Sequence, residues 1–493
     1  MNIDKLINQF VYIESEPLLF LSGLFLFFFL FFSTGYTLLH KKLNARVVYV
    51  VFFSLFFYYK TSGLYFLLLI FLSLSDFSIG RFLKIVTEQK QRRYLLALSI
   101  VVNLSILFYF KYTSLLADLF NDIFRGNLSF GEIFLPIGVS FFTFQSMSYT
   151  IDIYRGKIKP LKRWIDYLFY LSFFPQLVAG PIVRASEFIP QIRRNPIVVS
   201  RADLGRGVLL IVCGLFKKGV ISDYISLNFV DRIFDAPLLY TGFENLIGVY
   251  GYALQIYCDF SGYSDIAIGL ALLLGFHFND NFNSPYKSAT ITEFWRRWHI
   301  SLSSWLRDYL YISLGGNRKG RVRTYLNLMI TMLLGGLWHG AAWRFVAWGA
   351  IHGVSLAIHK LLMAQFPALK REGKEMNRGI RILSIIATFN LVSFGWIFFR
   401  ADSFTVATDL ITQIFTNFKG SICLDFIVGY KYVVLLMIIG YISHFFSDNL
   451  YNKINSLFVK APIVLYPVTI ALVIWLLIQL RSGAVQPFIY FQF

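Results

Sequence analysis

The chain has 493 residues, of which 57% are hydrophobic and 15% are charged, and its mean hydropathy is +0.61. This composition is too apolar for an ordinary soluble protein, so we expect the chain to lie in a lipid bilayer. The formal charge of +19 is compatible with nucleic-acid binding, but the basic residues fall in short clusters between apolar runs. That pattern is typical of the cytoplasmic loops of membrane proteins, and we expect no nucleic-acid partner.

Apolar runs long enough to cross, or nearly cross, a hydrocarbon core of about 30 Å occur throughout the chain. The first six lie near residues 18–38, 46–59, 62–79, 94–110, 132–153 and 165–180. The others lie near residues 207–222, 243–257, 261–276, 325–343, 345–362, 381–399, 427–446 and 462–480. We therefore predict an all-α, polytopic membrane protein with about ten to twelve transmembrane helices in one integral membrane domain, residues 1–493.

The basic clusters predict which loops face the cytoplasm. The residues expected on that side include Lys41, Lys42, Arg46, Arg81, Lys84, Arg92, Arg93, Lys370, Arg371, Arg378 and Arg381. The N-terminus and the acidic loop 231–244 are expected on the opposite side. We expect no cleaved signal peptide, because Asp4, Glu14 and Glu16 precede the first apolar run.

The run near residues 165–180 is broken at Pro175 and at Gly180–Pro181. The loops on either side of it, 155–163 and 184–206, are both basic, so a simple alternation of sides fails there. A re-entrant segment that returns on the same face would resolve the conflict, provided that protein or water shields its non-helical backbone.

Residues 279–323 form a polar intrusion into this apolar chain. Between Lys287 and Arg323 lie eight basic residues and only two acidic ones, Glu293 and Asp308. We therefore expect this segment on the cytoplasmic side.

Within this segment, Thr290 and Glu293 fit a capping box at the start of a helix. The apolar positions that then recur at helical spacing are Phe294, Trp298, Leu302, Trp305, Leu306 and Tyr309. The pattern predicts one amphipathic helix, lying in the interface or partly enclosed by the bundle. A plain interfacial helix with aromatic anchors and snorkelling arginines is the structural alternative.

Two histidines are candidate functional residues. His299 follows Trp295 by one helical turn, and its imidazole could exchange a proton or hydrogen-bond a substrate carbonyl. His339 lies within the apolar run 325–343, where an ionisable group is costly and suggests a function. The small residues around it, which permit close helix packing and could leave space for a substrate, are Gly335, Gly336, Gly340, Ala341 and Ala342. A lone histidine such as His299 is more often structural than catalytic, and His339 could instead be a neutral group hydrogen-bonded across a tight helix pair.

The chain has no GxSxG, Walker A, HExxH or Cys–His signature, and no carboxylate lies within a helical turn of His339. Its three cysteines, Cys213, Cys258 and Cys423, are far apart, so we expect no metal site and no tightly bound cofactor. A single buried imidazole can still act as a general base, taking the proton from a hydroxyl that attacks a thioester.

A second polar cluster places Asp259 and Asp265 inside an apolar stretch. Each carboxylate could orient a histidine or pair with an arginine such as Arg296 or Arg297. Pairing is the commoner use of a buried acid, so we favour an ion pair.

Seven stretches of the chain, in order, resemble the membrane-bound O-acyltransferase family. They are residues 174–184, 259–267, 281–286, 294–303, 310–318, 335–341 and 394–400. The resemblance covers residues 130–405 approximately and implies a family core there, followed by a C-terminal transmembrane extension over 406–493.

The resemblance implies that His339 is the catalytic histidine, that His299 is a second and less uniformly required catalytic position, and that a funnel or tunnel crosses the membrane. The residues expected to bind substrate are Trp338, Trp298, Asn283, Tyr286, Arg296 and Asp259. The expected donor is acetyl-CoA on the cytoplasmic side of a bacterial inner membrane. The acetyl group would reach hydroxyls of an exported polysaccharide, with an SGNH-type acetyltransferase as partner.

Three alternatives remain open. The D-alanyl-transferring branch of the same family carries both histidines and takes its acyl group from a carrier protein. Its members are typically shorter, whereas this chain continues past Arg400 with two further apolar segments. A transporter or flippase would also use buried polar residues and broken helices. The third alternative is a scaffold for an acylating partner. The acceptor could be alginate, cellulose, another exopolysaccharide or peptidoglycan.

Overall fold

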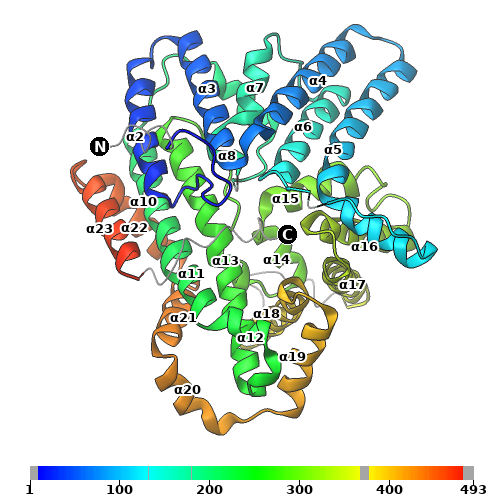
Figure 1. Cartoon of the computed structure of the whole chain (residues 1–493), viewed down its shortest axis with the longest axis vertical. Coiled ribbons are helices and arrows are strands. Elements are labelled where there is room, and N and C mark those ends of the chain that lie inside the picture. The colour runs from blue at the N-terminus through cyan, green and yellow to red at the C-terminus, as the bar shows by residue number, and fades with distance from the viewer. Residues whose placement is uncertain (1–8, 132, 179, 367–376, 481–493) are drawn as a thin grey trace. The chain divides into compact units, whose positions relative to one another are not determined.

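The computed structural model describes residues 9–131, 133–178, 180–366 and 377–480. Every regular element in these residues is a helix, which confirms the predicted all-α class (Figure 1). The chain divides into two compact units. The first comprises Met1–Ile211, Tyr263–Asn279 and Phe458–Ala461, and the second comprises Val212–Gly262, Asp280–Leu457 and Pro462–Phe493. Among the basic residues expected in the cytoplasm, Lys370 and Arg371 lie outside the described residues.

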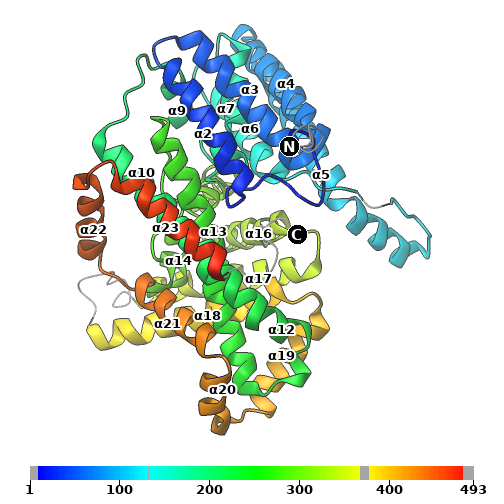
Figure 2. The ribbon, with the colours of Figure 1, turned by 60° about the vertical axis from the view of Figure 1, so that its left-hand side comes forward.

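The first unit is a bundle built from the N-terminal helices (Figures 1 and 2). These helices are α2 (Gly23–Leu38), α3 (Leu43–Ser62), α4 (Phe66–Ile85), α5 (Gln89–Phe124), α6 (Val139–Tyr154), α7 (Trp164–Ser172), α8 (Phe174–Leu177) and α9 (Ala185–Ile192), with a 3-10 turn at Gly63–Tyr65. Every side chain of α6 before its last residue is buried. Helix α6 therefore lies in the interior of this unit, where it contacts α4, α5 and α7.

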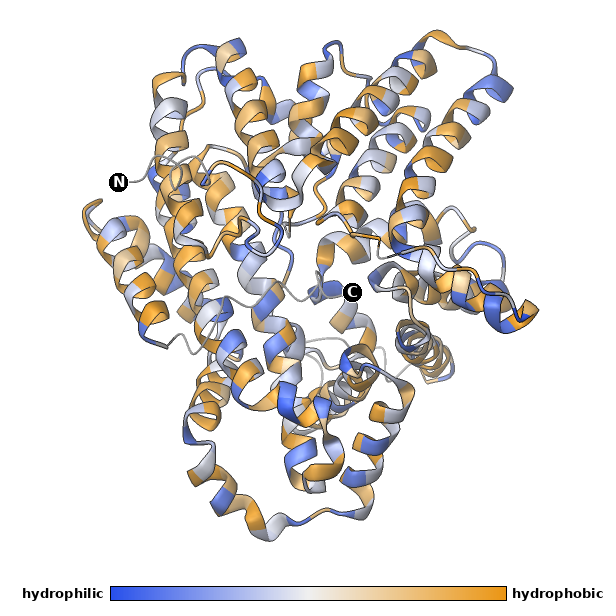
Figure 3. Cartoon of the chain, in the orientation of Figure 1, coloured by the Kyte–Doolittle hydropathy of each residue, from blue (hydrophilic) through white to orange (hydrophobic). Residues whose placement is uncertain are grey.

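The outer helices of the first unit present apolar side chains outward. Figure 3 shows hydrophobic residues along α2 to α5 and hydrophilic residues at the turn between α4 and α5. Exposed side chains on these helices include Phe31, Phe52 and Val101. Apolar side chains on an outer face are what a helix in contact with lipid tails requires, because the hydrocarbon core offers no hydrogen bonds.

The run near residues 165–180 is broken, as its prolines indicated. It forms α7, of nine residues, and α8, of four residues. At about 1.5 Å per residue, neither helix crosses a core of about 30 Å. The re-entrant path of this segment stays a prediction.

The second unit contains most of the remaining helices. They are α11 (Asp223–Ile225), α12 (Asp231–Asp235), α14 (Ile291–Arg297), α15 (Ile300–Trp305), α16 (Arg321–His339), α17 (Trp343–Gln365), α18 (Arg378–Arg400), α19 (Phe404–Thr416), α20 (Cys423–Gly429), α21 (Lys431–His444), α22 (Asp448–Lys460) and α23 (Leu465–Leu480). Shorter π-helical segments lie at Phe216–Ser222, Ser226–Val230 and Leu306–Tyr311, and 3-10 turns at Pro237–Leu239, Pro285–Lys287 and Gly420–Ile422. Three helices, α10 (Arg201–Leu215), α13 (Gly242–Leu273) and α22, contribute residues to both units.

Several helices are long and apolar enough to cross a membrane, as a polytopic membrane protein requires. Within the described residues there are five, at Leu43–Ile85, Gln89–Phe124, Gly242–Leu273, Trp343–Gln365 and Arg378–Arg400. The bent pair Gly420–Gly429 and Lys431–His444 raises the number to six if it is one span. This is fewer than the ten to twelve predicted spans. The stretch Leu43–Ile85 joins two predicted runs, and other runs form helices of 16 residues or fewer, such as α2 and α6.

Helices α16 and α17 of the second unit pack closely, as the small residues in 335–342 predicted. A Cβ at Gly336 would collide with the carbonyl oxygen of Phe345, and a Cβ at Gly349 with that of Met332. Glycine at both positions therefore lets the two backbones approach without side chains between them.

Candidate active site

His339 is the last residue of α16, and its side chain is buried among aromatic rings. The imidazole contacts Trp338, Trp348 and Phe399, with ring centroids 5.1, 5.0 and 5.2 Å apart. The rings come from α16, α17 and α18, so three helices of the second unit meet at this histidine. Such aromatic walls exclude water from a reacting group.

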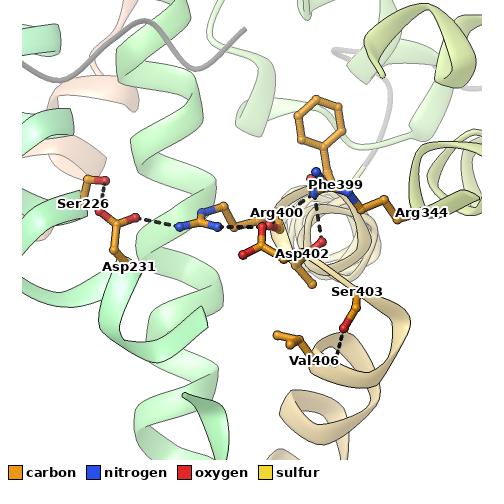
Figure 4. A network of polar contacts seen from close by, with 9 residues as sticks. Ser226, Asp231, Arg344, Phe399, Arg400, Asp402, Ser403 and Val406 are labelled. Atoms are coloured by element: carbon orange, nitrogen blue, oxygen red, sulfur yellow. Dashed lines mark hydrogen bonds and ion pairs between the residues drawn. The ribbon is translucent and has the colours of Figure 1, made fainter. Parts of the chain in front are cut away.

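A polar network holds one of these walls in place (Figure 4). The Arg344 guanidinium donates hydrogen bonds to the carbonyl oxygens of Phe399 and Ala401, at 3.0 and 2.9 Å. It thereby satisfies carbonyl groups that the end of α18 leaves without helical partners. Arg400 pairs with Asp231 at 2.9 Å. These contacts fix the end of α18 and with it the Phe399 ring that lies on His339.

His299 is fully buried and lies between α14 and α15, with a left-handed backbone (φ 42°). Its ring contacts Phe260 at 4.5 Å, Trp338 at 6.1 Å and Phe282 at 6.3 Å between centroids. A left-handed φ cannot occur inside a right-handed helix, so the chain turns at this residue.

The single amphipathic helix predicted for residues 290–309 is therefore wrong in one respect. The segment consists of α14, α15 and a π-helical turn, with the break at His299. The physical cause lies outside the segment, at Asn281. The Asn281 carbonyl oxygen accepts a hydrogen bond from the Ile300 N–H at 2.9 Å, and its side-chain oxygen accepts one from the Ser301 N–H at 3.2 Å. Asn281 thus satisfies the first N–H groups of α15, as an N-cap does.

Other features of this segment are confirmed. Thr290 caps α14 as predicted, since its side chain accepts from the Glu293 N–H at 3.1 Å. The Glu293 carboxylate accepts from the Ala289 N–H at 2.9 Å, one residue before the N-cap N–H that a capping box would use. The apolar face is buried inside the second unit at all six predicted positions, Phe294, Trp298, Leu302, Trp305, Leu306 and Tyr309. The segment is enclosed by protein, which favours the partly enclosed arrangement over a plain interfacial helix.

Trp338 connects the two histidines. Its ring lies 6.1 Å from that of His299 and 5.1 Å from that of His339. The structure therefore brings together three of the residues that the sequence singled out, although they lie 40 positions apart along the chain. A substrate bound against Trp338 would be within reach of both imidazoles.

Burial lowers the pKa of His299 to about 3, from the ordinary value of 6.5. His299 lies outside the helices that are long and apolar enough to span the membrane. Desolvation penalises the charged form, so the imidazole is neutral near pH 7 and one of its nitrogens carries a lone pair.

Trp298 and Tyr286 form the aromatic packing beside His299. Trp298 contacts Phe282 at 5.1 Å, and Phe282 in turn contacts the His299 ring. The Tyr286 hydroxyl donates to the Ala253 carbonyl oxygen at 2.6 Å. Both side chains are therefore held within the protein interior.

Asn283 and Arg296 lie at the surface of the second unit. The Asn283 backbone is tied to Arg297, whose carbonyl oxygen accepts from the Asn283 N–H at 2.9 Å. Neither side chain is part of the buried aromatic group around the histidines. Their predicted contact with substrate stays a prediction.

Asp259 forms the predicted ion pair, but with a different partner. Lys218, which is 1% exposed, contacts the carboxylates of both Asp259 and Asp223. The proposed arginine partner Arg297 instead pairs with Glu293 at 2.9 Å. Sequence reasoning missed Lys218, although a lysine inside the apolar run 207–222 was a signal, because a buried cation needs an anion nearby.

Asn281 was also missed. It begins the stretch 281–286 that carries the family resemblance, but its role depends on contacts with residues 18 to 20 positions later. No local pattern identifies such a partner. In the described part of the chain, no group of three or more His, Cys, Asp or Glu side chains could hold a metal ion.

Comparison with known proteins identifies one family model and several relatives that match this chain. Residues 161–394 match the family model described as the membrane-bound O-acyltransferase family. The chain is 43% identical over 338 residues to the "probable alginate O-acetylase AlgI" of Azotobacter vinelandii, covering 67% of this chain and 64% of that protein. It is 35% identical over 423 residues to the "peptidoglycan O-acetyltransferase" of Helicobacter pylori, covering 80% of this chain and 79% of that protein. A more distant relative is the "teichoic acid D-alanyltransferase" of Bacillus subtilis, 30% identical over 283 residues, which cover 54% of this chain and 69% of that protein. The match thus spans less than two thirds of the alginate relative.

Proposed function

The chain belongs to the membrane-bound O-acyltransferase family, and on that premise we propose that it is an O-acetyltransferase for an exported polysaccharide. The donor is a cytoplasmic thioester, acetyl-CoA, and the enzyme lies in the bacterial inner membrane. The observation that carries the proposal is the pair of buried histidines on Trp338, within the residues that match the family. The acetylating activities named for two relatives support the choice of acyl group.

In this mechanism His339 is the general base. Its imidazole takes the proton from an acceptor hydroxyl while the hydroxyl oxygen attacks the thioester carbonyl carbon. The new C–O bond forms, the C–S bond breaks, and the leaving thiolate receives the proton that His339 holds. The rings of Trp338, Trp348 and Phe399 exclude water, which limits competing hydrolysis of the thioester.

His299 is the second catalytic residue. Its contact with Trp338, which also contacts His339, supports a role at the same substrate. The remaining substrate contacts proposed here are those of Trp298, Tyr286, Asn283, Arg296 and Asp259. The first acceptor is a hydroxyl of an SGNH-type partner on the outer side, which passes the acetyl group to the polysaccharide.

The test uses the purified full-length protein with acetyl-CoA labelled in its acetyl group. We expect release or transfer of labelled acetyl by the wild type and a loss of at least 100-fold, roughly, in His339→Ala. His359→Gln is the matched control, because His359 is a half-buried histidine on α17 that hydrogen-bonds Thr292 and lies outside the proposed site. Full activity of a folded His339→Ala variant would refute the assignment.

The D-alanyl-transfer alternative is supported by the more distant teichoic acid relative. It predicts that the protein accepts D-alanine from a charged carrier protein and leaves acetyl-CoA intact. Supplying both donors in parallel therefore decides between the two acyl groups. A transporter or a scaffold would consume neither donor.

A further inference from the structure

We propose that Asn281 is a positioning residue that fixes the tautomer of His299, so that Nε2 of this histidine carries the lone pair. The inference rests on the proposed function, because it assigns a chemical role to a nitrogen of a residue in that site. It goes further by naming which of the two ring nitrogens acts, and in which direction the hydrogen bond runs.

The contact itself is buried and lies within hydrogen-bond distance. The Asn281 side chain is 1% exposed, and its Oδ1 lies 3.1 Å from Nδ1 of His299. The Ser301 side chain also donates to this oxygen, at 2.9 Å. The Ile300 N–H is bound to the Asn281 backbone carbonyl, so both the backbone and the side chain of Asn281 hold the turn at His299.

The orientation of the Asn281 amide follows from its neighbours. The Ser301 backbone N–H, which can only donate, points at the same atom at 3.2 Å. An amide NH₂ at that position would face another N–H, so the atom must be the oxygen. Because an amide oxygen only accepts, Nδ1 of His299 must be the protonated nitrogen.

This assignment decides between two roles for His299. In a neutral imidazole with the proton on Nδ1, Nε2 is an acceptor and cannot donate to a substrate carbonyl. His299 therefore accepts a hydrogen bond, or a proton, from a hydroxyl or thiol. The alternative, in which its ring polarises the substrate carbonyl by donating a hydrogen bond, needs the opposite tautomer.

The groups around His299 bear on any measurement of its titration. The rings packed on it are Phe260 of α13, Phe282 and Trp338 of α16. Three titratable residues lie within two positions of these rings in the sequence: Asp259, Asp280 and His339. The Asp259 carboxylate is paired with Lys218. A change at Asn281 must therefore be compared with variants that leave these groups in place.

The decisive experiment compares two substitutions of Asn281 in the full-length protein, using labelled acetyl-CoA. Asn281→Leu keeps the size of the side chain but removes the acceptor, and we expect kcat to fall about 10- to 100-fold with little change in KM. Asn281→Asp keeps an oxygen for Nδ1, the Ser301 N–H and the Ser301 hydroxyl. We expect this variant to retain kcat within about five-fold.

The titration of His299 itself provides a readout that a purely structural role would not change. A carboxylate at position 281 favours the imidazolium form of His299 and raises its pKa. In Asn281→Asp the ring resonances of His299, followed by NMR of the full-length protein, should therefore titrate at higher pH than in the wild type, by about one unit. An unmoved titration of His299, together with equal losses of kcat in Asn281→Asp and Asn281→Leu, would overturn the inference.

Asn245 provides the matched control. It is a fully buried asparagine in the same unit, and its amide donates to the carbonyl oxygens of Pro237, Tyr240 and Thr241. Asn245→Leu should lower thermal stability without a specific loss of kcat per folded molecule.

If His299→Ala keeps full activity, the proposed function of His299 fails. If His299→Ala is inactive while Asn281→Leu is as active as wild type, only the positioning role fails.

Discussion

Two buried polar regions, one in each unit, show how differently a membrane protein can use such groups. In the first unit, the Asp76 carboxylate accepts hydrogen bonds from Ser99 at 2.6 Å, Asn103 at 2.7 Å and Ser146 at 2.5 Å. The donors come from α5 and α6, while Asp76 belongs to α4. Each of these three hydrogen bonds joins one helix to another, which is the pattern of a structural network.

The second region is the histidine centre, made of His299, Trp338 and His339. Here aromatic rings pack against both titratable side chains. One nitrogen of His299, Nδ1, is hydrogen-bonded to Oδ1 of Asn281. The comparison teaches that depth alone does not indicate function, because Asp76 and His339 are both buried. The surroundings distinguish them, since aromatic rings pack on His339 and exclude water, whereas hydroxyl and amide groups donate to the Asp76 carboxylate.

The largest effect is expected for His339→Gln, which should lower activity far more than stability. His339→Gln keeps a polar side chain of similar size, so stability should change by about 1 kcal/mol or less. Loss of the general base should lower kcat at least ~100-fold. Both quantities can be measured on the same detergent-solubilised sample. A large loss of stability with unchanged kcat per folded molecule would place His339 in the structural class with Asp76.

Asp76→Ala should give the opposite result. Three donors lose their acceptor, which should reduce the free energy of unfolding by about 2–3 kcal/mol. The kcat of the molecules that remain folded should stay within about three-fold of wild type, because no catalytic contact is removed. Asp76→Asn keeps one side-chain oxygen and should be less destabilised. A selective loss of kcat in a stable Asp76→Ala protein would break the distinction between the two regions.

A smaller effect tests how the α16–α17 contact supports the histidine centre. In Gly336→Ala the new methyl group would meet the Phe345 carbonyl oxygen, so the helices must separate. We expect a loss of about 1–3 kcal/mol in stability and a roughly ten-fold lower kcat, because His339 shifts with its helix. Gly335→Ala is the control, since its methyl group would contact only a Leu306 side-chain atom, at 3.2 Å. Equal effects of the two substitutions would argue against this coupling.

The smallest effect concerns Asp223, a buried acid of the second unit that takes no part in the proposed chemistry. Burial, above all, raises its pKa to about 6 from the ordinary value of 3.8, while Lys218 opposes the shift. Between these two values the folded protein binds the proton more tightly than the unfolded chain. Stability should therefore fall as pH rises from about 4 to about 6, by on the order of 1 kcal/mol. Unfolding curves of Asp223→Asn should lack this slope, and a wild-type protein that grows more stable over the same interval would contradict the sign.

The sequence by itself determined the features that depend on neighbouring residues. The apolar runs indicated a helical membrane protein, and Thr290 caps the helix that contains Glu293 as predicted. The small residues around His339 predicted the close packing of α16 on α17. An ionisable residue in an apolar run also marked His339 without any knowledge of its partners. The inferences about the fold succeed because helical periodicity, capping and hydropathy act over a few residues, while the function of His339 stays a prediction.

Only the tertiary structure determined which residues are hydrogen-bond and ion-pair partners. The break at His299 depends on Asn281, which lies 18 positions earlier and captures N–H groups that a continuous helix would have bonded internally. The ion pair of Asp259 depends on Lys218 from another segment, and the Asp76 cluster on three helices. The physical reason is the same in each case. A hydrogen bond or ion pair needs its atoms within about 3 Å, and only the packed fold brings residues from distant parts of the chain that close.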